Sequence, residues 1–275
     1  MRIINIYKNY SLRRKAQKFF LLNYFDRVIL KKKEFSHEKH RHRMVDYFNE
    51  NFKELESTQL FNDITFSICK VLKPKQIHQV GCFTCNDSRF LQKKNIKTKF
   101  INSDFDKERV KFLKNKFKSF YFKVLDLENT SPENFNKDDL VLANAVLTNI
   151  QPEKLKSLIS NIFLAKVKFL IIGDIYNKES LEINENSKSI PLHKETNYFH
   201  PYLSIAKQLN LQFFFIPDFI YTSYTVARGV FIVCKKKINI HNYLDHVLRS
   251  YLERQKKVLD KFEKTSINQH WKKSE

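Results

Sequence analysis

The sequence predicts an α/β fold in which helices cover both faces of a mostly parallel sheet, and three observations support this prediction. After Pro74, short apolar runs alternate with amphipathic stretches of about 8 to 13 residues, which is typical of βαβ units. Hydrophobic residues make up 42% and charged residues 29% of the 275 residues, so the chain can bury a core. No uncharged apolar stretch reaches the roughly 18 residues that a transmembrane helix needs.

The expected elements follow one another along the chain. Apolar residues at helical spacing from Leu60 to Leu72 predict a first helix, which Pro74 ends. Short apolar runs then predict strands over 77–81, 99–103, 120–125, 140–143, 169–173, 211–216 and 230–234. Helical spacing predicts helices over 87–94, 107–117, 152–164 and 201–209. Pro152 suits the first turn of its helix, and the polar stretch 175–198 is expected to be an irregular connection.

Three parts of the chain differ in composition. Residues 1–59 are expected to form a basic helical extension, 60–237 the α/β domain, and 238–275 a C-terminal amphipathic helix and tail. The tail places its apolar residues, such as Leu244, Leu248, Tyr251 and Leu252, on one stripe, with charged residues facing away. This stripe packs on its own domain or forms a homodimer contact.

The charge balance suggests a polyanionic partner. Fifty Lys and Arg residues exceed 29 Asp and Glu residues, which leaves a net charge of +21. Nucleic acid, an anionic membrane surface or a phosphorylated substrate would each suit this excess. The alternative is compositional, because abundant Lys, Asn, Ile and Phe are what an AT-rich genome encodes. The preference for Lys over Arg argues against sequence-specific DNA binding.

The basic N-terminal helices offer one place for such a partner. The apolar-rich stretch 19–30 precedes the triplet Lys31, Lys32 and Lys33. This order suits an interfacial helix on an anionic membrane, a nucleic-acid contact, a cap over an acceptor pocket, or a solvated basic face on an ordinary core helix.

The cysteines indicate the compartment. Four cysteines are too few for a disulfide scaffold and the first residues lack an apolar signal core, so we expect a cytoplasmic protein, with peripheral attachment to the membrane as an alternative. Cys82 and Cys85 form a C-x-x-C pair at a strand-to-helix turn, which suits a redox site, but no proline stands where a thioredoxin-type fold needs one. A single pair does not complete a metal site, so no metal is expected.

Polar residues follow the first four strands of the predicted sheet. Gly81, one of only 3 glycines, ends the first strand, and Asp104 ends the second, 23 residues later. The carboxylate of Asp104 can accept hydrogen bonds from both hydroxyls of a ribose. Asp126, after the third strand, can accept from an adenine amino group, and Asn144 ends the fourth strand. The adenine ring would lie between Phe105 and Leu127. Ligands of parallel sheets bind at this carboxyl edge.

These residues resemble the class I S-adenosylmethionine-dependent methyltransferases over about residues 60–236. The matching segments are Gln79-Val80-Gly81-Cys82-Phe83-Thr84-Cys85, where the family has an acidic residue and then G-x-G-x-G, together with 102–106, 124–127 and 139–147. The resemblance implies a Rossmann-like seven-stranded sheet whose last strand is antiparallel. It also implies an S-adenosylmethionine site that includes Gly81, Cys82, Phe83, Asp104, Phe105, Asp126, Leu127 and Asn144.

The resemblance implies methyl transfer, and we expect an oxygen of a small-molecule or saccharide-like acceptor to receive the methyl group. An oxygen acceptor usually needs a general base, and His200 is the leading candidate among His193, His200, Asp174 and Tyr176. The segment after the fourth strand lacks the N-P-P-Y pattern of enzymes that methylate base amines, although a nucleic-acid acceptor stays open. Phe83 and Cys85 replace two family glycines, so the rival hypothesis is a basic binding or scaffold protein that kept the fold and lost the cofactor.

Overall fold

The computed structural model describes residues 59–177, 181, 187–193, 197–223 and 226–235, with positions 245, 248–249, 251–253 and 256. All of them belong to the unit Lys53–Glu275. The predicted basic helices before residue 59 therefore lie outside the described residues, and their proposed partners stay predictions. No helix in the described part of the chain is long and apolar enough to cross a membrane.

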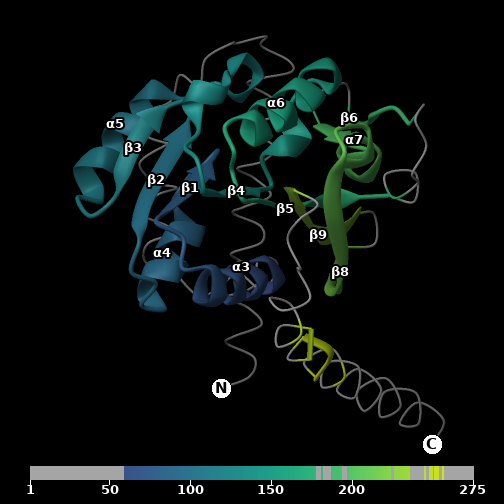
Figure 1. Cartoon of the computed structure of the whole chain (residues 1–275), viewed down its shortest axis with the longest axis horizontal. Coiled ribbons are helices and arrows are strands. Elements are labelled where there is room, and N and C mark those ends of the chain that lie inside the picture. Colours follow the sequence, from purple (N-terminus) through teal and green to yellow (C-terminus); the bar gives the residue numbers. More distant parts are fainter. Residues whose placement is uncertain are drawn as a thin grey trace, which may run out of the picture. The chain divides into compact units, whose positions relative to one another are not determined.

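Seven strands form one sheet in the spatial order β3-β2-β1-β4-β5-β9-β8 (Figure 1). The bounds are β1 Gln76–Val80, β2 Lys99–Asp104, β3 Tyr121–Val124, β4 Leu140–Asn144, β5 Phe169–Tyr176, β8 Leu211–Ser223 and β9 Val226–Lys235. Strands β1 to β5 pair in parallel, whereas β9 pairs antiparallel with both β5 and β8. The predicted mostly parallel sheet with an antiparallel last strand is thus confirmed.

The prediction of an irregular connection over 175–198 is partly wrong. Strand β5 continues to Tyr176, and β6 (Ile190–His193) pairs antiparallel with β7 (Asn197–Phe199) in a separate two-stranded sheet. Strand β5 continues because β9 pairs with it as far as Tyr176. Backbone pairing of this kind does not require an apolar side chain at every position, so polarity alone underestimates strand length.

Helices cover the sheet on both faces. They are α3 (Gln59–Leu72), α4 (Asn86–Lys93), α5 (Lys107–Lys116), α6 (Pro152–Leu164) and α7 (Tyr202–Gln208). The core on one face joins α6 and α7 to alternate residues of β4 and β5, such as Val141 and Leu170. Helix α3 lies on the opposite face, where Phe61 approaches Gly173 of β5 so closely that a Cβ there would lie 2.6 Å from the phenyl ring. The first four residues of both β4 and β5 are buried, as expected for central strands covered on both sides.

The described part of the C-terminal segment includes one buried anchor. Tyr251 is buried, and its hydroxyl donates a hydrogen bond to the carbonyl oxygen of Pro217 at 2.6 Å. Leu252, which the sequence places on the same apolar stripe, is 63% exposed. Tyr251 thus meets β8, and whether the rest of the stripe packs on its own domain or forms a homodimer contact stays a prediction. Leu248 of the predicted stripe is half-buried, and the other predicted stripe residues lie outside the described part of the chain.

Candidate functional site

The carboxyl ends of β1, β2 and β4 lie side by side. Val80 of β1 pairs with Ser103 of β2 on one side and with Ala143 of β4 on the other. The residues that follow these positions, Gly81, Asp104 and Asn144, are therefore neighbours at one edge of the sheet. The structure brings together these three predicted site residues, as parallel pairing requires.

The turn between β1 and α4 keeps an unusual backbone. Gly81 (φ 58°), Phe83 (φ 47°) and Cys85 (φ 58°) all lie in the left-handed region. These are the three positions at which the resembled family has glycine, although only one of them is a glycine here. A left-handed conformation costs a residue with a Cβ roughly 1–2 kcal/mol. The turn is held by Cys82, whose amide donates to the carbonyl oxygen of Ser103 at 2.8 Å.

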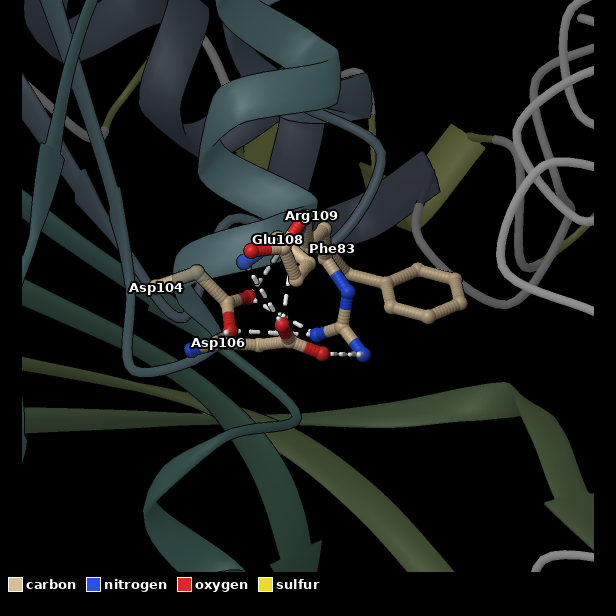
Figure 2. Close-up of polar contacts among 5 residues, drawn as sticks. All are labelled: Phe83, Asp104, Asp106, Glu108 and Arg109. Atoms are coloured by element: carbon tan, nitrogen blue, oxygen red, sulfur yellow. Dashed lines mark hydrogen bonds and ion pairs between the residues drawn. The ribbon is translucent and has the colours of Figure 1, made fainter. Parts of the chain in front are cut away.

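Asp104, the predicted ribose carboxylate, is 2% exposed and fully engaged by the chain itself (Figure 2). Its Oδ1 accepts from the Asp106 amide at 3.1 Å and from Nη1 of Arg109 at 3.1 Å. Its Oδ2 accepts from the Phe83 amide at 3.2 Å and from the same Nη1 at 3.0 Å. A carboxylate has about four lone-pair positions, so none is left for a ribose hydroxyl while Arg109 occupies two of them.

Phe83 and Val146 complete this closed arrangement. The guanidinium of Arg109 lies 5.0 Å from the centre of the Phe83 ring, a cation–π contact that can be followed in Figure 2. Val146, which follows β4, packs against Gly81 so tightly that a Cβ at Gly81 would lie 2.2 Å from its Cγ2. The aromatic side chain at the second family glycine therefore stacks on the arginine that occupies the carboxylate.

The predicted adenine contacts are only partly assembled. Asp126 is exposed and caps the short helix Leu127–Asn129 by accepting from the Glu128 amide at 3.0 Å. Phe105 is 53% exposed, whereas Leu127 is buried in the core. Asp126 and Phe105 are accessible to a ligand, but the buried Leu127 does not present a free face opposite Phe105 in this conformation.

Asn144 belongs to a polar network that the sequence did not reveal. Its Nδ2 donates to Oδ1 of Asp87 at 3.0 Å, and its Oδ1 accepts from Arg228 at 3.2 Å. Oδ2 of Asp87 accepts from Nε2 of Gln79 at 2.7 Å. Burial raises the pKa of Asp87 to about 6, against the opposing effects of Asn144 and Arg228. Gln79 holds the position where the family has an acidic residue, so here helix α4 supplies the carboxylate at this corner.

His200, the predicted general base, is completely buried and uses both ring nitrogens. Nε2 lies 2.9 Å from the carbonyl oxygen of Leu147 and Nδ1 lies 2.7 Å from the hydroxyl of Ser189. The carbonyl can only accept, so Nε2 donates and Nδ1 accepts the hydroxyl proton. Burial lowers the pKa of His200 to about 4. This is the geometry of a structural histidine, and the assignment of a base to His200 stays a prediction that the geometry does not favour.

The other base candidates are placed as follows. Asp174 is buried and accepts from the Thr148 amide at 2.9 Å and from the Tyr202 hydroxyl at 2.7 Å. Burial raises the pKa of Asp174 to about 6. Tyr176 packs edge-on against Phe215, and the side chain of His193 lies outside the described ones. Asp174 therefore connects β5 to Thr148, which follows β4, and to Tyr202 of α7.

The C-x-x-C pair does not have the features of a redox centre. Both thiols are buried, and burial raises the pKa of Cys82 well above its ordinary value, with its neighbour Cys85 as a second cause. A raised pKa opposes the thiolate that thiol chemistry requires. Within the described residues, no group of three or more His, Cys, Asp or Glu side chains is placed to hold a metal ion.

Comparison with known proteins defines the fold. No protein-family model matches the chain, and no curated protein matches its sequence. A TehB-like SAM-dependent methyltransferase from Corynebacterium glutamicum superposes with a TM-score of 0.50 at 14% identity, over 73% of this chain and 100% of that one. The N-terminal domain of EvdMO1, solved with SAH bound, superposes with a TM-score of 0.50 at 10% identity, over 67% of this chain and 82% of that one. The chain has the Rossmann-like fold of the class I SAM-dependent methyltransferases.

Two arginines that shape this site were missed in the sequence. Arg109 lies in the first turn of α5, where Asp106 caps the helix and also pairs with Arg109 at 3.7 Å. The spacing Asp106-x-x-Arg109 was the available signal, because side chains three apart meet on a helix. Arg228 lies on β9, far along the chain, and no local pattern connects it with Asn144.

Proposed function

We propose that this protein binds S-adenosylmethionine at the ends of β1, β2 and β4 and transfers its methyl group to an oxygen of a small-molecule or saccharide-like acceptor. The observation that carries the proposal is the left-handed backbone at Gly81, Phe83 and Cys85. All three positions of this turn have the left-handed backbone that favours glycine, although Phe83 and Cys85 carry side chains that make this conformation strained. Strain of this kind persists where the surrounding structure imposes it, and it concentrates at functional sites.

The residues at this edge have the right chemistry for the cofactor. Gly81 and the turn after it would lie beside the ligand, and Asp126 is exposed for an adenine amino group. Asp104 would accept the ribose hydroxyls once Arg109 releases its two positions. S-adenosylmethionine supplies an activated methyl group, so the protein mainly aligns the acceptor. The two neighbours described above are named as SAM-dependent or solved with SAH, which supports the same cofactor here.

Arg109 makes the proposal testable with matched variants. Isothermal titration with S-adenosylhomocysteine compares the wild-type protein with Arg109→Ala and Asp104→Asn, and with Lys111→Ala as a control on the exposed face of α5. We expect binding by the wild-type protein, tighter binding by Arg109→Ala because the competitor is removed, and loss of binding by Asp104→Asn. Circular dichroism verifies that each variant is folded. Absence of binding by both the wild-type protein and Arg109→Ala would falsify the proposal.

A second candidate function rests on the saturated state of Asp104. With its lone-pair positions taken by Phe83, Asp106 and Arg109, the site resembles that of a relative which kept the fold as a non-catalytic binding or scaffold protein. The same titration separates the two candidates. Binding by Arg109→Ala but not by the wild-type protein indicates a cofactor site that the native arginine closes. Absence of binding by both the wild-type protein and Arg109→Ala favours the scaffold.

A further inference from the structure

The segment that runs from the end of α4 through β2 and α5 to the start of β3 is strongly basic. Nine lysines between residues 93 and 118 are exposed, against the single exposed acid Glu108, a balance of 9 − 1 = +8. These lysines are Lys93, Lys94, Lys97, Lys99, Lys107, Lys111, Lys114, Lys116 and Lys118. Asp104 and Asp106 also lie in this segment, but both are buried and paired with Arg109.

This excess is local and not a uniform result of composition. Residues 131–177 expose four lysines (Lys137, Lys154, Lys156 and Lys166) and two acids (Glu133 and Glu153), a balance of 4 − 2 = +2 over a longer segment. A compositional bias would raise the charge of both segments alike. Six of these lysines, from Lys99 to Lys118, lie on β2, on α5 or just after it, at the end of the sheet where β3 is the outermost strand (Figure 1).

The lysines of α5 form a row. Lys107, Lys111 and Lys114 share one face of the helix, while Val110 and Leu113 point into the core. The helix has 10 residues, and at a rise of about 1.5 Å per residue it is about 15 Å long. About four nucleotides of a stacked strand span this length at roughly 3.4 Å each.

Exposed aromatic rings lie at both ends of this row. Phe105, 53% exposed, follows β2 just before α5, and Tyr121, 61% exposed, begins β3 just after it. The ammonium of Lys99 lies 4.6 Å from the centre of the Tyr121 ring, so cation and ring occupy one surface. Rings beside a row of lysines are the combination that binds single-stranded nucleic acid, since unpaired bases stack on rings and phosphates meet lysines.

We propose that this surface, the outer face of α5 with the exposed parts of β2 and β3, binds single-stranded nucleic acid without strong sequence preference. The charged groups are lysines, which neutralise phosphates but lack the fork with which arginine reads bases. A membrane surface fits less well. The apolar side of α5, formed by Val110 and Leu113, is already buried in the domain, so the helix has no free apolar face to insert into a membrane. The proposal is independent of cofactor binding, and Phe105 extends the surface to the residue beside Asp104.

The test measures fluorescence anisotropy of a labelled 12-nucleotide oligo(dT) with the full chain across a range of salt concentrations. Lys111→Gln/Lys114→Gln removes two charges from α5, and Lys154→Gln/Lys156→Gln removes two exposed charges from α6 as the matched control. Each phosphate contact on a single strand contributes about 0.7 to the salt slope. We expect the α5 variant to lower the slope by about 1.4 and to weaken binding about 25-fold at 0.1 M salt, and the α6 variant to bind as the wild-type protein does.

A second pair of variants tests the stacking surface. Tyr121→Ala is expected to weaken binding at least about fivefold, the lower end of a base–aromatic stack, while Tyr121→Phe keeps wild-type affinity. Equal weakening by the α5 and α6 variants would overturn the proposal, because the charge would then act without a defined surface. Binding to phosphatidylserine vesicles that the α5 variant loses, with no binding of oligo(dT), would overturn it in favour of a membrane surface.

Discussion

Replacing Arg109 tests whether the closed arrangement around Asp104 is a stabilising part of the fold. The Arg109→Met variant removes both hydrogen bonds that Nη1 donates, at 3.1 and 3.0 Å, from side chains that are 13% and 3% exposed. Breaking a buried ion pair costs roughly 3–5 kcal/mol because the remaining charge stays buried. Asp104 retains the amides of Phe83 and Asp106, which places the cost at the lower end, about 3 kcal/mol. Loss of the contact between Arg109 and the Phe83 ring adds about 0.5–1 kcal/mol.

Urea unfolding at pH 7, followed by circular dichroism, measures this cost. Lys107→Met is the matched control, because Lys107 is an exposed cation on the same helix and exposed substitutions usually change stability by less than about 0.5 kcal/mol. The double variant Asp104→Asn/Arg109→Met removes the stranded charge and should be more stable than Arg109→Met alone. A cost for Arg109→Met below about 1 kcal/mol, or no larger than that of Lys107→Met, would refute the reasoning that the pair is buried and mutually dependent.

Three further predictions concern other contacts. Gly81→Ala is expected to lower the free energy of unfolding by about 3 kcal/mol, because φ is left-handed at 58° and the new Cβ would lie only 2.2 Å from Cγ2 of Val146. Adding Val146→Ala should regain the part of this loss that comes from the clash, but not the part that comes from the backbone conformation. His200 has a folded pKa of about 4 against an ordinary 6.5, so the unfolded state binds more protons between these values and stability falls as pH drops from 6.5 to 4, by about 3 kcal/mol. His200→Asn should lack this loss, and parallel pH profiles of the two proteins would contradict it. Tyr251→Phe removes the bond to the Pro217 carbonyl and should cost about 1 kcal/mol, whereas an unchanged unfolding midpoint would show that this anchor contributes nothing.

The predicted order of strands and helices is confirmed for the described residues, and several bounds agree closely. The helix Pro152–Leu164 has the predicted ends, because proline defines its start and the apolar spacing continues through its last turn. Strand β8 extends to Ser223, well past the predicted 216, and β9 begins four residues before the predicted 230. These two strands pair with each other, and backbone hydrogen bonds extend a hairpin beyond the apolar run that made it recognisable.

The position of the candidate site was predictable from the sequence, but the hydrogen-bond partners of its residues were not. Gly81, Asp104 and Asn144 meet at one edge because consecutive parallel strands bring their carboxyl ends together. The partners of these residues could not be inferred in the same way. Asp104 meets Arg109 because the first turn of α5 turns that side chain back toward the strand, and Asn144 meets Arg228 only because β9 inserts beside β5.

The sequence alone determined the kind of fold and the edge at which a ligand would bind, because hydrophobic periodicity and the order of strands act through local propensity and burial. Tertiary structure decided whether that edge is open. Hydrogen-bonding capacity is a property of assembled groups, and the two oxygens of Asp104 become saturated only when the turn, the strand end and α5 come together. A carboxylate in a sequence can accept from any donor, whereas a carboxylate in a folded protein accepts from the donors that packing has placed around it.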